Sequence, residues 1–113
     1  MGITSLTDKD ETLSLALGGL DKGITPLEMA GAYATIANDG QYIEPTFYTK
    51  IETAKGKNLM KSKQKKTKVF SKEVAYVLKE LLKQPVEGSS GTAKLCKIDG
   101  MDVSAKTGTT NDN

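Results

Sequence analysis

The segment best suited to carry chemistry is Lys106-Thr107-Gly108-Thr109-Thr110. A lysine on a strand presents one cation at a fixed position, and a glycine two residues later leaves room for another molecule to approach the backbone. The hydroxyl groups of Thr107 and Thr109 add hydrogen-bond donors. Together these groups could hold a carboxylate against an exposed strand edge. A Lys-Thr-Gly triplet is equally compatible with an ordinary strand end and turn, so its surroundings must decide between the two.

A phosphate-binding loop is a rival interpretation of the same residues. The stretch from Gly100 to Thr107 nearly fits the pattern G-x-x-x-x-G-K-[ST]. Ala105 stands where that pattern needs a glycine to wrap the phosphates. The loop must also open a helix, and the residues after Thr107 have poor helix propensity. Nucleotide binding is therefore disfavoured, and a magnesium–ATP titration would test it.

The composition restricts the chemistry further. The 113 residues include a single cysteine, Cys96, and no histidine, which excludes a disulfide framework, imidazole catalysis and most zinc sites. A base in this chain must be Lys, Asp or Glu, and we expect neither a metal nor a cofactor. All sixteen basic residues are lysines. Because arginine is the commonest reader of guanine, nucleic-acid binding is disfavoured.

The length and hydropathy pattern favour one domain or less. With 37% hydrophobic residues the chain can bury a modest core. No apolar run approaches the roughly 20 residues of a membrane helix, so we expect no membrane segment in this chain. The first residues do not resemble a signal peptide, and Met1 lies close to a patterned segment, which favours an artificial start.

The lysines are unevenly distributed. Segment 50–68 contains only one acidic residue, Glu52, and holds half of the lysines: Lys50, Lys55, Lys57, Lys61, Lys63, Lys65, Lys66 and Lys68. Such a run could meet phosphates or an anionic membrane surface. A solvated loop is the ordinary interpretation of a charge run, and we expect that here.

Two helices are predicted around the motif. The first begins with Thr25 as N-cap, Pro26 as the first helical residue and Glu28 closing a capping box, and Gly40 supplies its left-handed stop. The second begins at the N-cap Ser71 and is expected to end at Pro85. Its predicted buried stripe consists of Val74, Val77, Leu78, Leu81 and Leu82. We expect the helices to pack on each other or on a strand through Tyr33, Ile36, Val77 and Leu81.

The strand pattern is weaker. Segment 47–53 is rich in strand-forming residues, Lys55 to Asn58 has the composition of a turn, and Leu59-Met60 is predicted to return as a second strand. Met101 to Thr107 is predicted as a strand leading into Gly108. The leucines between Leu13 and Leu20 fit helical and strand spacing equally well.

The order of these pieces resembles penicillin-binding proteins of the bifunctional class A type. The matching segments are Leu15–Gly19, Gly23–Gly40, Ser71–Leu82 with Gly91-Thr92-Ala93, and Ala105–Asp112. They cover most of Leu13–Asn113 in the family's order, and the lysine-rich stretch matches least. The resemblance implies that residues 1–113 are part of a transpeptidase domain. It also implies an α+β, serine β-lactamase-like fold with helices packed on a small antiparallel sheet.

Only one of the family's three catalytic motifs is expected in this chain. The letters Ser-x-x-Lys occur once, at Ser62-Lys63-Gln64-Lys65, but nothing around them is apolar enough to form a buried face that would lower the pKa of a lysine. We interpret them as a chance match. Ser-x-Asn is absent, and Thr109-Thr110-Asn111 only mimics it. In the family both motifs precede the segment that resembles Leu13–Gly40, so they are expected upstream of Met1.

The third motif is Lys106-Thr107-Gly108, and the resemblance implies a role for each residue. Lys106 would attract the substrate's terminal carboxylate and support proton transfer. The Thr109 hydroxyl would bind that carboxylate, while its N–H would form half of an oxyanion hole. Gly108 would leave room for the acyl chain, and Thr107 would shape the strand.

The resemblance also implies the substrates and the place of action. The complete enzyme would act on D-Ala-D-Ala stem peptides of peptidoglycan through an acyl-serine, and β-lactams would acylate the same serine. It would work at the extracytoplasmic face of the bacterial membrane, anchored upstream of this segment. We expect residues 1–113 alone to be inactive. A non-catalytic peptidoglycan-binding relative is the alternative, favoured if the parent sequence lacks Ser-x-x-Lys.

Overall fold

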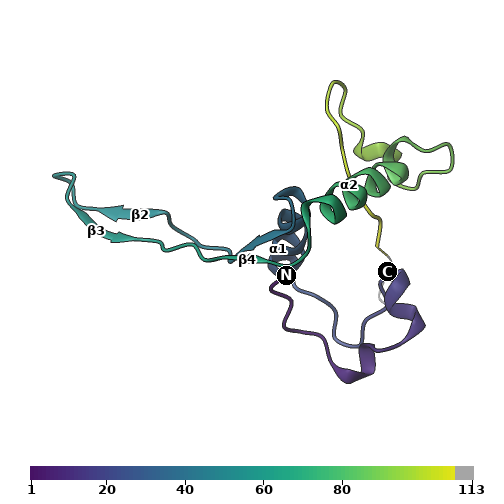
Figure 1. Ribbon diagram of the computed structural model, residues 1–113, viewed down its shortest axis with the longest axis horizontal. Helices are drawn as coiled ribbons and strands as arrows, with labels where there is room; N and C mark the ends of the chain where they lie inside the picture. Colours follow the sequence, from purple (N-terminus) through teal and green to yellow (C-terminus); the bar gives the residue numbers. More distant parts are fainter. Residues whose placement is uncertain (109–113) are drawn as a thin grey trace.

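The computed structural model describes residues 1–108, which form two α-helices and four short strands joined by 3₁₀ turns (Figure 1). In chain order the described elements are 3₁₀ turns at Asp8–Asp10 and Leu13–Leu17, α1 (Pro26–Ala37), β1 (Gln41–Ile43), β2 (Lys50–Glu52), β3 (Asn58–Lys61), β4 (Lys66–Lys68), α2 (Lys72–Glu87) and a 3₁₀ turn at Lys94–Cys96. Helices and antiparallel strands follow one another without a βαβ repeat, which confirms the predicted α+β class.

Helix α1 begins and ends as its sequence predicts. The Glu28 N–H donates to Thr25 Oγ1 at 3.2 Å, and the Thr25 N–H donates to Glu28 Oε2 at 3.0 Å, which completes the capping box. After Ala37 the chain passes through Asp39 (φ 51°) and Gly40 (φ 80°). A side chain at Gly40 would collide with the Phe70 carbonyl. Both the left-handed backbone conformation and this close contact therefore require a glycine here.

Helix α2 begins at the predicted cap but continues past its predicted end. The Val74 N–H donates to Ser71 Oγ at 3.3 Å. Pro85 lies inside α2, which reaches Glu87, so the prediction that Pro85 ends the helix was wrong. The physical reason is the position of Pro85 in the last turn of the helix. In the last turn a proline removes one backbone hydrogen bond, and the Gly88 N–H still donates to the Gln84 carbonyl at 2.8 Å.

The predicted buried stripe of α2 was also wrong in part. Val74 and Val77 are about half exposed and Leu81 is 61% exposed, whereas Leu78 and Leu82 are half-buried. The buried hydrophobic residues of the described chain are mostly small: Ala32, Ala75, Val86 and Ala93. The reason is geometric, because α2 packs against α1 and the 3₁₀ turn at Lys94–Cys96, and no described strand covers its other face. The helices were predicted to pack through four residues. Tyr33 and Ile36 of α1 are half-buried, whereas Val77 and Leu81 of α2 face solvent.

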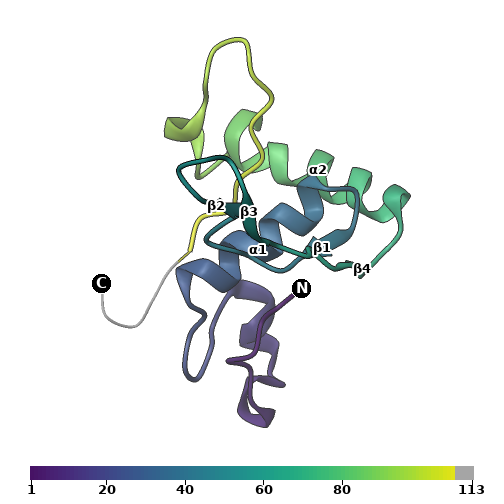
Figure 2. The ribbon, with the colours of Figure 1, turned by 90° about the vertical axis from the view of Figure 1, so that its left-hand side faces the viewer.

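The strands form two separate antiparallel pairs. β1 pairs with β4, with Ile43 opposite Lys66, and packs against α1. β2 pairs with β3, with Lys50 opposite Lys61 and Ile51 opposite Met60, which confirms the predicted return at Leu59-Met60. Residues 44–65, which we call the arm, extend away from the helices (Figure 1), and Figure 2 looks along the arm from its tip. β2 is shorter than the predicted strand and is exposed along its whole length, so neither helix packs on it.

The secondary structure of two further segments differs from the sequence-based expectation. Leu13–Leu17 is a 3₁₀ turn rather than an α-helix or a strand. Residues 101–108 form no regular strand, although the chain runs extended beside α2 there. None of the helices found in residues 1–108 has the length and apolar character needed to cross a membrane.

Candidate functional site

Lys106, Thr107 and Gly108 line an open groove of about 950 Å³. The groove's other wall is the loop Leu15–Ile24, and Met29 and Tyr33 of α1 complete the lining together with Ser104 and Ala105. Residues from the two ends of the described chain therefore face one another across this space. Figures 1 and 2 show the last described residues approaching the N-terminal third of the chain.

Helix α2 holds the motif segment in position. The Ala105 N–H donates to the Leu82 carbonyl at 2.9 Å, and the Ser104 hydroxyl donates to the Lys79 carbonyl at 3.0 Å. These two bonds hold the chain at the two residues that precede Lys106. Because α2 is a regular helix, they attach the motif to a rigid element rather than to another loop.

A charge cluster adds a third attachment. Lys83 of α2 reaches Glu80 at 2.9 Å and Asp102 at 3.0 Å. Its hydrogen bond to Glu80, followed by that to Asp102, raises the pKa of Lys83 above the ordinary lysine value. Asp102 is mostly exposed, so this pair contributes orientation more than stability.

Lys106 presents its charge to solvent. Its Nζ donates to the Thr107 carbonyl at 2.8 Å, and it forms no ion pair with any residue among 1–108. A carboxylate entering the groove would therefore meet a cation that no described acidic side chain neutralises. This is the arrangement expected for anion binding, since a charge-assisted hydrogen bond is stronger than a neutral one.

The two neighbouring motif residues differ in their surroundings. The Thr107 hydroxyl lies 3.0 Å from Thr92 Oγ1, which links the motif to the turn after α2. A Cβ built on Gly108 would have no described atom within 4 Å, so the backbone at Gly108 borders open space. Thr109, the fourth predicted binding residue, lies outside the described residues.

The opposite wall of the groove is shaped by a buried carboxylate. Asp10 accepts the N–H groups of Thr7 and Asp21, each at 2.7 Å, and so joins the two ends of the loop that contains Leu13–Leu17. These hydrogen bonds, that from Asp21 first, hold the pKa of Asp10 below its usual value. Gly18 then turns the chain with φ 92°.

Sequence reasoning missed this wall. Leu15 and Leu17 were given no functional role, yet Leu17 is 82% exposed and both line the groove. Tyr33, predicted as a core residue of α1, lines it as well. The Gly18-Gly19 pair was a usable signal, because two glycines after a short apolar run indicate a tight turn rather than a continuing core element.

The groove contains no activated nucleophile among its described lining residues. The Ser104 hydroxyl is engaged with the Lys79 carbonyl. Ser62, the serine of the chance Ser-x-x-Lys match, lies on the arm, where its Oγ is 3.5 Å from Thr46 Oγ1. Ser62 does not line the groove.

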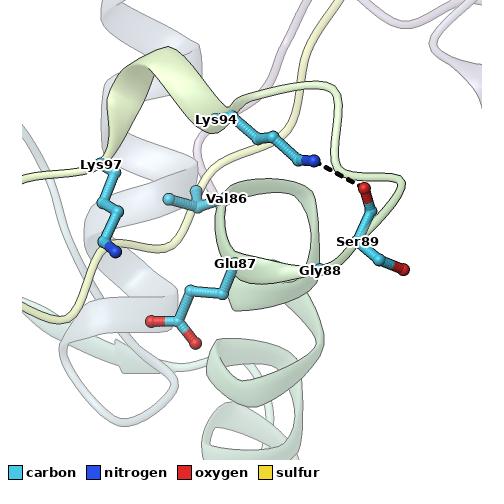
Figure 3. Close-up of a pocket in the computed structure, with 6 residues that line it drawn as sticks. All are labelled: Val86, Glu87, Gly88, Ser89, Lys94 and Lys97. Atoms are coloured by element: carbon cyan, nitrogen blue, oxygen red, sulfur yellow. Dashed lines mark hydrogen bonds between the residues drawn. The ribbon is translucent and has the colours of Figure 1, made fainter.

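A second cavity, of about 460 Å³, lies at the C-terminal end of α2 and is lined by Val86, Glu87, Gly88, Ser89, Lys94 and Lys97 (Figure 3). Lys94 Nζ donates to the Ser89 carbonyl at 2.6 Å, which closes the turn that follows the helix. None of the motif residues borders this cavity.

Comparison of the chain with known protein families identifies the class of protein to which the α+β fold and the groove beside Lys106 belong. Residues 4–113 match the penicillin binding protein transpeptidase domain, so the chain belongs to this family. This confirms the resemblance seen in the sequence.

The similar proteins carry the same family name. The chain is 42% identical over 107 residues to penicillin-binding protein 4 of Bacillus subtilis. The aligned residues make up 95% of the chain and 17% of that protein. It is 41% identical over 105 residues to penicillin-binding protein 1A of Clostridium botulinum (93% and 13% covered). It is 42% identical over 101 residues to penicillin-binding protein 1F of Bacillus subtilis (89% and 14% covered). The chain thus spans less than a fifth of the length of these relatives.

Proposed function

We propose that this chain supplies the Lys-Thr-Gly segment of a serine D,D-transpeptidase that cross-links peptidoglycan stem peptides ending in D-Ala-D-Ala. The observation that carries the proposal is the placement of Lys106 on a groove, with no described acidic partner, in a chain of the transpeptidase family. The parent protein would act at the extracytoplasmic face of the bacterial membrane.

The motif residues have distinct roles in this proposal. The Lys106 ammonium attracts the terminal carboxylate of the stem peptide, and the Thr109 hydroxyl binds that carboxylate. The open space at Gly108 admits the acyl chain. Lys106 also supports proton transfer during acylation.

The bond changes require a serine from another part of the whole protein. Its oxygen attacks the carbonyl of the penultimate D-alanine, the peptide bond to the last D-alanine breaks, and that D-alanine leaves as the free amino acid with the proton. A neighbouring amine then takes the acyl group and releases the serine. The N–H of Thr109 forms half of the oxyanion hole for both steps.

The whole protein that contains this segment provides the direct test. Lys106→Gln should lower the rate of acylation by a labelled penicillin by about 100-fold or more, because a charge aimed at the substrate carboxylate and a proton-transfer group are lost together. Lys97→Gln removes the same charge outside the groove and is the control. Equal rates for wild type and Lys106→Gln would overturn the proposal.

Residues 1–113 alone should not react with a β-lactam, because no activated nucleophile lines the described groove. Intact-mass measurement after incubation with a labelled penicillin should show no adduct. A stoichiometric adduct, on Ser62 or on any other residue, would contradict this expectation.

A further inference from the structure

The arm and the strand that follows it carry a charge very different from that of the rest of the molecule. Segment 50–68 contains eight lysines and one glutamate, a net charge of +7. The remaining residues contain eight lysines and thirteen acidic residues, a net charge of −5. The modest overall charge of +2 therefore conceals a strongly polarised chain.

The positive charge is displayed rather than neutralised. Every residue of β2, β3 and β4 is exposed. Lys50 pairs with Glu52 at 2.9 Å, but none of the other seven lysines of the segment forms an ion pair with a residue among 1–108. Figure 1 shows the arm, which carries most of these lysines, extending away from the helices.

The arm is also amphipathic. Neighbouring residues on a strand point to opposite faces, and directly paired residues share a face. Lys50 and Lys61 are paired and so lie on one face, whereas Ile51 and Met60 are paired and lie on the other. Ile51 is 43% exposed and Met60 is 54% exposed, so this apolar face is open to its surroundings. A protruding element with one basic and one apolar face has the pattern of segments that lie in a membrane interface.

We propose that the arm docks on a membrane surface rich in anionic phospholipids. The apolar face of Ile51 and Met60 enters the boundary between headgroups and acyl chains. The lysines of the opposite face and of the turn at Lys55–Lys57 extend to the level of the lipid phosphates, since a lysine stem is long enough to reach around a two-stranded hairpin. Attraction between a basic segment and anionic lipids supplies about a fivefold gain in binding per lysine.

The apolar face favours a membrane over a soluble polyanion as the partner. A polyanion would satisfy the lysines and leave Ile51 and Met60 in water. Only a surface that offers phosphates and an apolar layer together accounts for both faces of the arm.

Vesicle co-sedimentation of the full 113-residue chain tests the proposal. The chain should bind vesicles in which about one third of the phosphatidylcholine is replaced by phosphatidylglycerol, and should bind pure phosphatidylcholine far more weakly. Binding should weaken between about 0.1 M and 1 M salt, because the screening length falls from about 10 to about 3 Å. Equal sedimentation with the two kinds of vesicle would overturn the proposal.

Matched variants separate the contributions of charge and apolar surface. Replacing Lys55, Lys57 and Lys61 by Gln should reduce binding by about 100-fold. The control replaces Lys9, Lys94 and Lys97, which changes the net charge equally outside the arm and should leave at least a tenth of the binding. Equal losses in the two triple variants would show that overall charge, not the arm, attracts the vesicle.

Met60→Asn tests insertion directly. It should weaken vesicle binding by several-fold, whereas Leu81→Asn on α2, where the leucine is 61% exposed, should not. If Met60→Asn binds like wild type and soluble polyphosphate removes the chain from the vesicles, the arm is a site for polyanions and the membrane proposal is wrong. Circular dichroism of each variant checks that α1 and α2 remain folded.

Discussion

At the scale of single residues, Glu28 connects more of the chain than its place in a capping box suggests. Its Oε1 accepts the Thr4 N–H at 2.7 Å and the Thr4 hydroxyl at 2.8 Å, while its Oε2 accepts from Thr25. The backbone bonds from Thr4 and Thr25 lower the pKa of Glu28 to about 2. One carboxylate therefore joins the N-terminal segment to the start of α1.

The lowered pKa of Glu28 predicts that the folded chain loses stability in acid. Its pKa is lower in the folded chain than the ordinary value of 4.5, so its stabilising effect is complete above pH 4.5 and is lost as the pH falls towards 2. Glu28→Gln should therefore lower the unfolding free energy at pH 6 and show a smaller further loss between pH 5 and 2 than the wild type. Denaturant unfolding across this range measures the difference. Parallel pH curves for the two proteins would contradict the assignment.

Gly40 allows backbone strain and steric contact to be separated. Gly40 (φ 80°) and Gly100 (φ 77°) both adopt left-handed conformations, but only at Gly40 would a side chain meet another atom, the Phe70 carbonyl. Gly100→Ala should cost about 1–2 kcal/mol from backbone strain alone, and Gly40→Ala clearly more. Equal unfolding free energies for the two variants would show that Phe70 can move away at no cost.

At the scale of elements, α2 is stabilised by its small residues rather than by its large ones. Val86 is 3% exposed and Ala75 is fully buried, whereas Leu81 faces solvent. Val86→Ala should therefore cost about 2 kcal/mol of unfolding free energy. Leu81→Ala should change it by less than about 0.5 kcal/mol, the usual range for surface positions. A larger effect at Leu81 than at Val86 would reverse this interpretation.

The backbone of the motif segment should be held at Ala105 but not at Thr107 and Gly108. The Ala105 N–H is bonded to Leu82, but the N–H groups of Thr107 and Gly108 have no backbone acceptor among the described residues. Amide hydrogen exchange should therefore be slow at Ala105 and fast at Thr107 and Gly108. Exchange at Thr107 as slow as in the middle of α2 would mean that this part of the motif is docked, contrary to our expectation.

At the scale of the whole molecule, local signals were read correctly from the sequence and distant contacts were not. The caps at Thr25 and Ser71, the stop at Gly40 and the turn at Lys55–Asn58 depend on residues within a few positions of one another, so they could be predicted. Helix propensity and spacing also located α1 and α2. The motif Lys106-Thr107-Gly108 stays a prediction, which depends on the order of the segments before it and not on the triplet alone.

What could not be predicted depends on which surfaces meet. The pairing of Ile43 with Lys66, the approach of Leu15–Ile24 to Lys106 and the exposure of Leu81 each require the path of the chain through space. A hydrophobic stripe shows which face of a helix can be buried, but not whether an element is present to cover it. The prediction of where α2 ends was wrong for a related reason. The free energy that Pro85 costs the helix depends on how many helical hydrogen bonds remain beyond it.

The pairing of β1 with β4 has a consequence for how this region of the chain can change. Ile43 and Lys66 are direct partners, so the arm leaves and re-enters the body at one place. Replacing residues 44–65 by an Asn-Gly turn should leave β1 and β4 as an ordinary hairpin and shift the Tm by only a few degrees. The arm can then lengthen, shorten or change composition between related proteins while the groove beside Lys106 keeps its shape. Such freedom fits the expectation from the sequence that the lysine-rich stretch resembles the family least, and it makes this hairpin the natural place for lineage-specific attachments to evolve.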